Sequence, residues 1–424
     1  MKLRIAGAAR DTFQSLHVRN FRLFFFGQLV SQIGNWLTLI AETLLVLHLT
    51  NSGLAVGVLA ACQFAPVLVL GAWAGLIADR SDKRRLLVIV QVIAMAQSGV
   101  LAALAFSGSP PVILIDLVAL VGGCTIAFDN PARRAFVVEM VSDDDVNNAV
   151  SLNSALMTSA RIVGPAVAGL LVTVAGYGWC FAIDAVSYLA VIAAFVKMNT
   201  AELRVSPVAI KAKAQVRAGL RYVRTVPDLW IPLVMMAIVG TLAFNFQVVL
   251  SLFVTHTFHR GVGTFTVLFS ITAVGSLMGA LWSARRRSIA VHNVIIASAG
   301  FGVSMLVLAA SPTLAVAFPI GIAVGWTSIA FMTASTAIVQ VRADPAMRGR
   351  VLALQAIVFL GSTPIGGPVL GAICDAFGAR AGLVVGGAAA LGAAAFGSIA
   401  LRRNLARPAQ LDGTNIPPAD LQVA

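Results

Sequence analysis

The sequence predicts an all-α integral membrane protein with twelve transmembrane helices in two pseudo-symmetric six-helix bundles. Three observations indicate this class. The 424 residues are 59% hydrophobic and only 11% charged, with a mean hydropathy of +0.91. The apolar residues gather in twelve continuous stretches, and a glycine–proline motif of the first half recurs in the second. So little polar surface excludes a water-soluble globule of this length.

Each apolar stretch has the length of a membrane-spanning helix, because a hydrocarbon core of about 30 Å needs about 20 helical residues. A transmembrane barrel would need segments of about 10 residues with alternating polarity, whereas these stretches are continuously apolar. Helices also satisfy their own backbone hydrogen bonds in lipid. The predicted spans are residues 21–48, 54–78, 86–107, 110–129, 147–175, 178–197, 229–256, 262–284, 290–310, 313–338, 350–374 and 379–401.

The basic residues are distributed unequally between the two faces of the predicted membrane protein. All but three of the 30 Lys and Arg residues fall on the face that carries both termini. Arg260 and Arg380 fall on the other face, and Arg161 lies inside a span. The positive-inside rule therefore predicts a plasma (inner) membrane protein with both termini in the cytoplasm. The net charge of +13 is explained by this topology, so no nucleic-acid partner is expected.

An internal repeat divides the chain into two halves. Gly164-Pro165 and Gly169 in the fifth span recur as Gly367-Pro368 and Gly371 in the eleventh. Repeated halves of this kind place the substrate site between them, near mid-membrane. The expected parts are a cytoplasmic N-terminal segment 1–20, a six-helix bundle 21–197, a cytoplasmic amphipathic linker 198–228, a second bundle 229–403 and a disordered cytoplasmic tail 404–424.

Several motifs resemble those of one transporter family. The loop Gly75-x-x-x-Asp79-Arg80-x-x-Lys83-Arg84 and the run Gly164-Pro165-x-x-x-Gly169 are similar to the loop and fifth-helix signatures of the major facilitator superfamily. Four further runs resemble its branch of enterobactin-type siderophore exporters and macrolide-efflux proteins. They begin at Asn20, Gly27, Asp129 and Arg161. The resemblance covers the whole chain and implies the major facilitator fold.

The resemblance implies a gate at the cytoplasmic face. Its residues would be Gly75, Asp79, Arg80, Lys83, Arg84, Asp129 and Arg133. Gly75 would permit close helix approach, Asp79 would face a helix N-terminus, and the cations would pair with Asp129. The alternative is that the cations mark topology only. The sequence departs from the family pattern at Asp82, where Gly is usual, and at Ser283, which stands opposite Asp79 in the second half. The fourth span also lacks the buried Arg typical of many proton-coupled drug exporters.

Four ionisable residues inside apolar spans are the candidates for proton coupling, since charges in lipid usually line a cavity or find a partner. They are Glu42, Arg161, Asp116 and Asp184. Arg161 needs a carboxylate or water, and Glu42 is the first candidate. Burial favours a protonated carboxyl group and a nearby cation favours the charged form, so a moving Arg161 could switch Glu42. Asp116 could substitute or relay, and Asp184 fits a structural role better.

The helix-bend motifs are Gly164, Pro165, Gly169, Gly367, Pro368 and Gly371, which either seal the outer vestibule or serve packing alone. The candidates for the substrate cavity are Trp36, Phe244, Asn245, Gln247 and Gln355, each also explicable by packing or interhelical hydrogen bonds. His256, His259 and Arg260 have no metal-site spacing. No phosphate-binding loop or nucleophile–base pair occurs, so the protein is expected not to be an enzyme, and no cofactor, catalytic residue or metal is expected.

The sequence therefore predicts a secondary active transporter that exports a small amphipathic compound, such as a siderophore or a drug, by proton antiport. The expected partners are this small molecule, protons and the lipid bilayer, and the chain is expected to act as a monomer. The alternatives are an uptake or lysophospholipid-moving facilitator of the same fold, and a receptor or scaffold that transports nothing.

Overall fold

The computed structural model describes residues 13–204, 215–284 and 290–405. Within these ranges all regular elements are helical, and twelve helical spans are long and apolar enough to cross a membrane. The predicted fold class is thereby confirmed. Most of the N-terminal segment, residues 205–214 of the linker, Arg285 to Arg287 and most of the tail lie outside the described residues.

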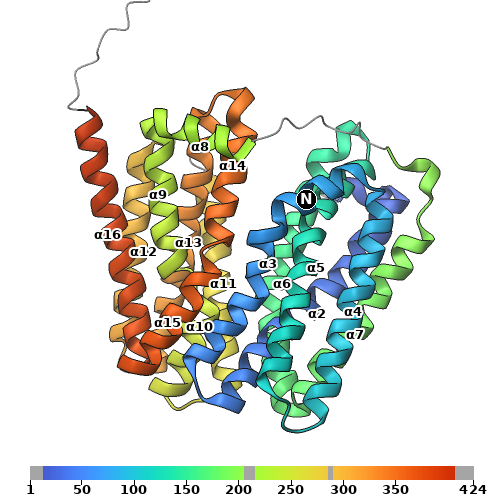
Figure 1. Ribbon diagram of the computed structural model, residues 1–424, viewed down its shortest axis with the longest axis horizontal. Helices are drawn as coiled ribbons and strands as arrows, with labels where there is room; N and C mark the ends of the chain where they lie inside the picture. Colours follow the sequence, from blue (N-terminus) through green and yellow to red (C-terminus); the bar gives the residue numbers. More distant parts are fainter. Residues whose placement is uncertain (1–12, 205–214, 285–289, 406–424) are drawn as a thin grey trace, which may run out of the picture.

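Six long helices form the first bundle, which Figure 1 shows beside the second. They are α2 (Arg19–Thr50), α3 (Gly53–Arg80), α4 (Lys83–Phe106), α5 (Val112–Glu139), α6 (Val146–Ala175) and α7 (Tyr177–Lys197). Three short turns accompany them, at Gln14–His17, Asp143–Asp145 and Thr200–Glu202. At one end of the bundle Phe24, Phe136 and Phe195 pack edge-on or tilted, with ring centroids 5.8–6.4 Å apart.

Helix α5 is longer than the sequence indicated. The predicted span stopped at residue 129, with Arg133 and Arg134 in a loop, but the helix continues through Pro131 to Glu139. Proline removes only one backbone bond, and burial of Phe136 and Val137 favours the added turns. Arg133 is consequently held on a helix inside the bundle.

The second bundle contains two interrupted spans. Its elements are α9 (Pro227–Leu242), α10 (Phe246–Leu252), a π-helical turn (Phe253–Thr257), α11 (Val262–Ala284), α12 (Val291–Ala310), α13 (Leu314–Arg342), α14 (Pro345–Leu360), α15 (Thr363–Phe377) and α16 (Ala379–Leu405). The predicted spans 229–256 and 350–374 are both found, at Pro227–Thr257 and Met347–Phe377, but each is interrupted once. At the first break the Asn245 side chain donates to the Thr241 carbonyl, 2.7 Å away, in place of a backbone amide. At the second, Pro364 lacks the amide that would continue the ladder.

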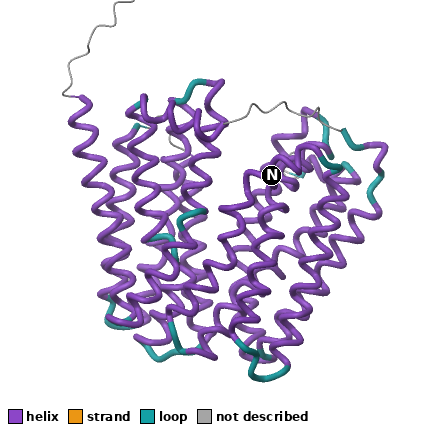
Figure 2. Tube along the Cα trace, viewed as in Figure 1, coloured by secondary structure: helices purple, strands orange, loops and turns teal. Residues whose placement is uncertain are grey.

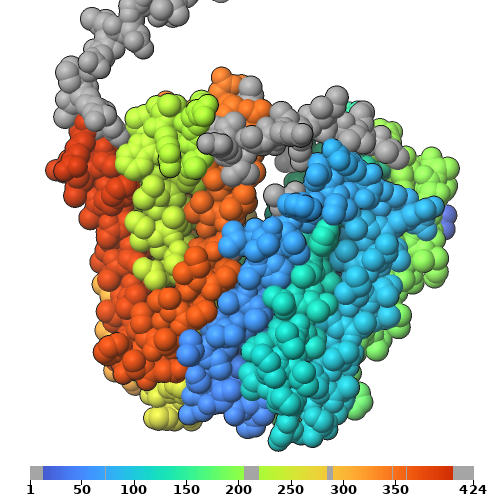
Figure 3. Space-filling view, in the orientation of Figure 1, coloured from blue at the N-terminus to red at the C-terminus, as the bar shows by residue number. Residues whose placement is uncertain are grey.

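The helix ends define two ends of the molecule. We call the end with Asn20, Arg80 and Glu139 the basic end, and the end with Asn51, Gly176 and Gly378 the distal end. Figures 1 and 2 show the bundles converging at the distal end, where α10 and α15 lie beside α2 and α3. Figure 3 shows a hollow between them toward the basic end.

The described part of the linker contains α8 (Gln215–Thr225), which lies at the basic end of the second bundle. Its Val223 is buried, whereas Arg221 and Arg224 are exposed. Leu220, three residues before Val223, is 37% exposed. Tyr222 accepts a hydrogen bond from the backbone of Asp344, at 3.0 Å, which ties the linker to the start of α14.

Candidate functional site

The distal end is closed by contacts between the two bundles at glycine residues. A Cβ atom built on Gly57 of α3 would lie within 3.0 Å of the Gly367 backbone on α15, and one on Gly371 would meet Gly53 equally closely. A Cβ on Gly169 of α6 would likewise collide with Thr266 of α11. The predicted Gly-Pro motifs thus lie at the two lines of contact between the bundles.

A charged cap reinforces the distal closure. Asp375 of α15 accepts hydrogen bonds from the hydroxyl group of Ser52 (2.8 Å) and from the amides of Gly53 (2.6 Å) and Leu54 (2.9 Å). These amides begin α3 in the other bundle, so the carboxylate also faces the positive end of that helix. His256 and Asn51, 3.0 Å apart, add a further link between the bundles.

Asp375→Asn is expected to loosen this closure by about 1–3 kcal/mol, because charge-assisted hydrogen bonds are lost. Hydrogen exchange at the first amides of α3, followed by mass spectrometry, should speed up about tenfold or more. Asp82→Asn is the matched control, since Asp82 caps α4 within its own bundle at the basic end. Unchanged exchange in the Asp375 variant would show that the cap does not hold the closure.

A cavity of about 260 Å³ opens in the first bundle. Its lining from α2 to α5 and α7 combines amides, aromatic rings and an ion pair: Gln32, Asn35, Trp36, Leu39, Phe64, Val90, Gln91, Ala94, Thr125, Ile126, Asp129, Asn130, Arg133 and Tyr188. Trp36 reaches the other bundle, with its ring centroid 6.1 Å from that of Phe269 on α11. Apolar and aromatic walls with a few placed polar groups are typical of small-molecule sites.

The ion pair in this cavity replaces part of the expected gate. Asp129 bonds Arg133 at 2.6 Å and accepts from Gln91 at 3.0 Å. Two of the loop cations expected to pair with Asp129 have other partners in this conformation: Lys83 binds Glu139 at 2.7 Å, and Arg84 donates to the Phe195 carbonyl at 2.6 Å. The extra turns of α5 bring Glu139 to Lys83 and leave Asp129 deeper in the bundle.

The glycine of the loop signature makes no tight contact in this conformation. A Cβ atom on Gly75 would meet nothing within 4 Å, so the close helix approach expected there is not made. Asp79 is partly buried and Arg80 is exposed.

Glu42 lies in a buried network of amides rather than beside a cation. Its carboxylate accepts from Gln63 of α3 at 2.5 Å and from Gln97 of α4 at 3.4 Å. Gln63 in turn accepts from Gln247 of α10, at 3.4 Å, in the other bundle. Gln247, predicted to face a substrate, instead joins the bundles: it also donates to Thr43 and to the Leu39 carbonyl of α2.

The expected Glu42–Arg161 pair is not formed. Arg161 lies on α6, which packs on α2 at Trp36, since a Cβ on Gly164 would collide with that ring. Glu42 is six residues further along α2, about 240° around the helix, and faces α3 and α4 instead. The Arg161 Nε atom is buried without a hydrogen-bond partner, and the ion pairs found among the described residues do not include Arg161.

The other two intramembrane acids differ in surroundings. Asp184 of α7 accepts from the hydroxyl groups of Thr38 (2.7 Å), Ser98 (2.8 Å) and Ser187 (3.4 Å). These bonds fasten α2, α4 and α7 together. Asp116 of α5 is buried, and its Oδ1 atom has no hydrogen-bond partner.

Three candidates for the substrate cavity are placed within the second bundle. Phe244 packs against Phe246, Phe301 and Phe359, with centroids 5.1–5.8 Å apart. Gln355 bonds Thr336 at 3.3 Å, and Asn245 stands at the helix break. These contacts favour packing. The sequence reasoning missed residues such as Gln63, Gln91, Gln97 and Tyr188, although glutamines inside apolar spans were a usable signal.

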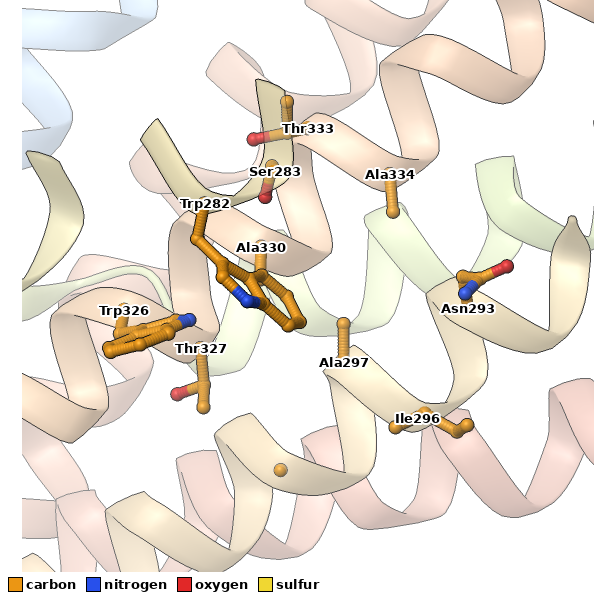
Figure 4. Close-up of a pocket in the computed structure, with 11 residues that line it drawn as sticks. Trp282, Ser283, Asn293, Ile296, Ala297, Trp326, Thr327, Ala330, Thr333 and Ala334 are labelled. Carbon is orange, nitrogen blue, oxygen red and sulfur yellow. The ribbon is translucent and has the colours of Figure 1, made fainter. Parts of the chain in front are cut away.

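A second cavity, of about 180 Å³, lies in the second bundle (Figure 4). Its lining comes from α11, α12 and α13, including Asn293, and contains no charged side chain. Trp282 and Trp326 meet edge to face beside it, 5.8 Å apart. It does not reach the bundle interface, so the first cavity is the better candidate. Among the described residues no group of three or more His, Cys, Asp or Glu side chains could hold a metal ion.

Comparison with known proteins gives the family. The family described as transmembrane secretion effector (MFS_3) matches residues 10–422. The staphyloferrin A transporter of Staphylococcus aureus is 30% identical over 168 residues, which are 39% of this chain and 42% of that protein. Macrolide efflux protein A of Streptococcus pyogenes is 28% identical over 169 residues, which are 39% of this chain and 42% of that protein. The chain thus spans less than half the length of these two relatives.

Other similar proteins match over most of the chain. The multidrug efflux pump Tap of Mycolicibacterium fortuitum is 26% identical over 384 residues, 85% of this chain and 90% of that protein. Among solved structures, a bacterial homolog of the human lysosomal transporter Spinster has a TM-score of 0.73 at 15% identity, covering 91% of this chain and 97% of the other. A bacterial homologue of the iron transporter ferroportin has a TM-score of 0.71 at 14% identity, covering 90% of this chain and 98% of the other. These structures share the fold.

Proposed function

Because the chain belongs to the transmembrane secretion effector family, in the efflux branch of the major facilitator transporters, we propose that it exports a small amphipathic compound by alternating access, coupled to proton entry. The main support is the placement of two sites along one path. The cavity of the first bundle lies on the side of the basic opening, and the acid Glu42 lies beyond it, beside the closed distal contacts.

In this proposal the bundles 21–197 and 229–403 are the two rocking units. The positive-inside rule assigns the basic end to the cytoplasm of a plasma membrane protein, with both termini inside. The conformation with a closed distal end then takes up its substrate from the cytoplasm. Asp79 and its loop would act in the opposite conformation, when the basic end closes.

The cavity supports an amphipathic substrate. Trp36 offers an aromatic face and Asp129–Arg133 a charged pair. Arg161 lies on the face of α6 shared with Gly164 and Met157. Because its Nε atom is buried without a hydrogen-bond partner, it favours a compound that carries a negative group. Siderophores, drugs and similar metabolites are the proposed class, and the names of the relatives support it.

Glu42 is the proposed proton carrier, with Asp116 as substitute or relay. Both are buried carboxyl groups on the helices that surround the cavity. Asp184 is proposed to be structural. One chain contains both bundles and the cavity, so the proposal takes a monomer as the transport unit.

The test is a transport assay in cells that lack the protein, with the wild type restored. Internal levels of erythromycin, ethidium and staphyloferrin A are measured with and without a protonophore. Export predicts a lower internal level of at least one compound, and the protonophore should abolish the difference. A raised level would instead favour uptake, and no change for any compound would favour a receptor or scaffold.

A further inference from the structure

We propose that Gln63 and Gln247 link the proton on Glu42 to closure of the distal end. This inference rests on the proposed proton antiport and assigns it two positioning residues. The observation behind it is a chain of three side chains that crosses from the first bundle to the second: Glu42 on α2, Gln63 on α3 and Gln247 on α10.

Each hydrogen bond in this row of three side chains has a defined donor and a defined acceptor. The Gln63 Nε2 atom donates to Glu42 at 2.5 Å, and its Oε1 atom accepts from Gln247 at 3.4 Å. A primary amide has one donor side and one acceptor side. While Gln247 donates to Gln63, the NH₂ group of Gln63 therefore points toward Glu42.

The side-chain amide of Gln247 cannot exchange the positions of its NH₂ group and its oxygen. Its Nε2 atom also donates to the Leu39 carbonyl, at 3.4 Å, and to the hydroxyl oxygen of Thr43. The Thr43 hydroxyl group itself donates to the Leu39 carbonyl, at 2.9 Å. A main-chain carbonyl only accepts hydrogen bonds. An inverted Gln247 would set its own oxygen against that carbonyl oxygen, which is unfavourable in a buried site.

The consequence is a proton affinity that depends on conformation. In the closed distal state Glu42 faces the donor groups of Gln63 and Gln97, which suits a carboxylate, since a protonated acid needs an acceptor for its O–H group. When the distal end opens, Gln247 leaves with its bundle. Gln63 can then turn its oxygen toward Glu42 and hold the proton there. Gln97 belongs to the same bundle as Glu42 and stays with it in both states.

The other titratable groups near Glu42 do not cross the interface. Asp116 of α5 and Asp184 of α7 act on it electrostatically, as does Tyr188 of α7. Arg161 of α6 makes no ion pair with it among the described residues, and α10 carries no ionisable side chain. All these groups move with the first bundle. By linkage, a proton on Glu42 favours distal opening by the same factor by which opening favours the proton.

The experiment measures distal opening against pH in the purified full-length protein. Cys62, Cys124, Cys180 and Cys374 are replaced, and spin labels are placed at Ser109 and Phe377, which are exposed at the distal end of opposite bundles. In the wild type the ratio of open to closed molecules should rise about tenfold from alkaline to acid pH. In Gln247→Leu and Gln63→Leu the fraction of molecules with an open distal end should be higher than in the wild type, but it should no longer change with pH. Gln355→Leu is the matched control, since Gln355 bonds within its own bundle, and it should keep the response.

The outcomes separate the two proposals. If Gln247→Leu shifts the open fraction equally at every pH and keeps the full response, Gln247 is only a structural tie and the inference is overturned. In Glu42→Gln the distal end should be open in most molecules, and the open fraction should not depend on pH. A full response in that variant would remove Glu42 as the proton site, and with it the proposed coupling mechanism.

Discussion

Replacing Glu42 by Gln is expected to lower proton-driven export about tenfold or more, with the protein still in the membrane. Glutamine keeps the size of the side chain and can accept the hydrogen bond from Gln63 through its own oxygen. It cannot bind or release a proton. The measurement is internal accumulation of an exported compound, with membrane levels of the variant and wild type matched and with a protonophore as the second arm.

Asp184→Asn is the control for this prediction. Asp184 is as deeply buried as Glu42 but is held by three hydroxyl groups from α2, α4 and α7. We expect its replacement to lower thermal stability and protein yield, while export per molecule stays sensitive to the protonophore. Protonophore-sensitive export that persists in Glu42→Gln would contradict the role given to Glu42.

The second large effect is expected from Gly57→Val. The added side chain would meet the Gly367 backbone, which cannot move aside as a flexible side chain could. Overpacking typically costs about 1–3 kcal/mol, which changes the ratio of closed to open molecules about 5- to 150-fold. Labels at Ser109 and Phe377 should report a largely open distal end, and export should fall in parallel.

Gly71→Val is the matched control on the same helix. A Cβ atom at Gly71 meets nothing within 4 Å, so the same change in side chain should leave both opening and export near wild type. If Gly57→Val also leaves the distal end closed, the glycine contacts do not govern this gate.

Much of the fold was accessible from the sequence, because lipid imposes a simple rule on it. Each span needs a continuous apolar run, and all twelve predicted spans correspond to helices. The predictions and the structure differ at polar residues and prolines, because such a residue can either interrupt a helix or lie within one. Pro131 is inside a helix, whereas Pro364 follows a break. Burial of Phe136 decides the first case, and hydropathy alone cannot show it.

The site was less predictable, since its chemistry depends on which helix faces which. Glu42 could be selected as an intramembrane acid, but its partners are uncharged amides from α3, α4 and, through Gln63, α10. A search for an opposite charge led to Arg161, which faces another way. The Gly-Pro repeat gave the correct helices for close packing, although its partners Gly53 and Gly57 carry no signature of their own.

Proton movement during transport tests the proposed antiport most directly. The purified protein is placed in liposomes that enclose a pH-sensitive dye, and a compound identified by the cellular assay is added. Proton antiport through Glu42 predicts that the wild type moves protons opposite to the compound and that Glu42→Gln moves none. Movement of the compound without protons, or equal proton movement in the variant, would contradict proton antiport through Glu42.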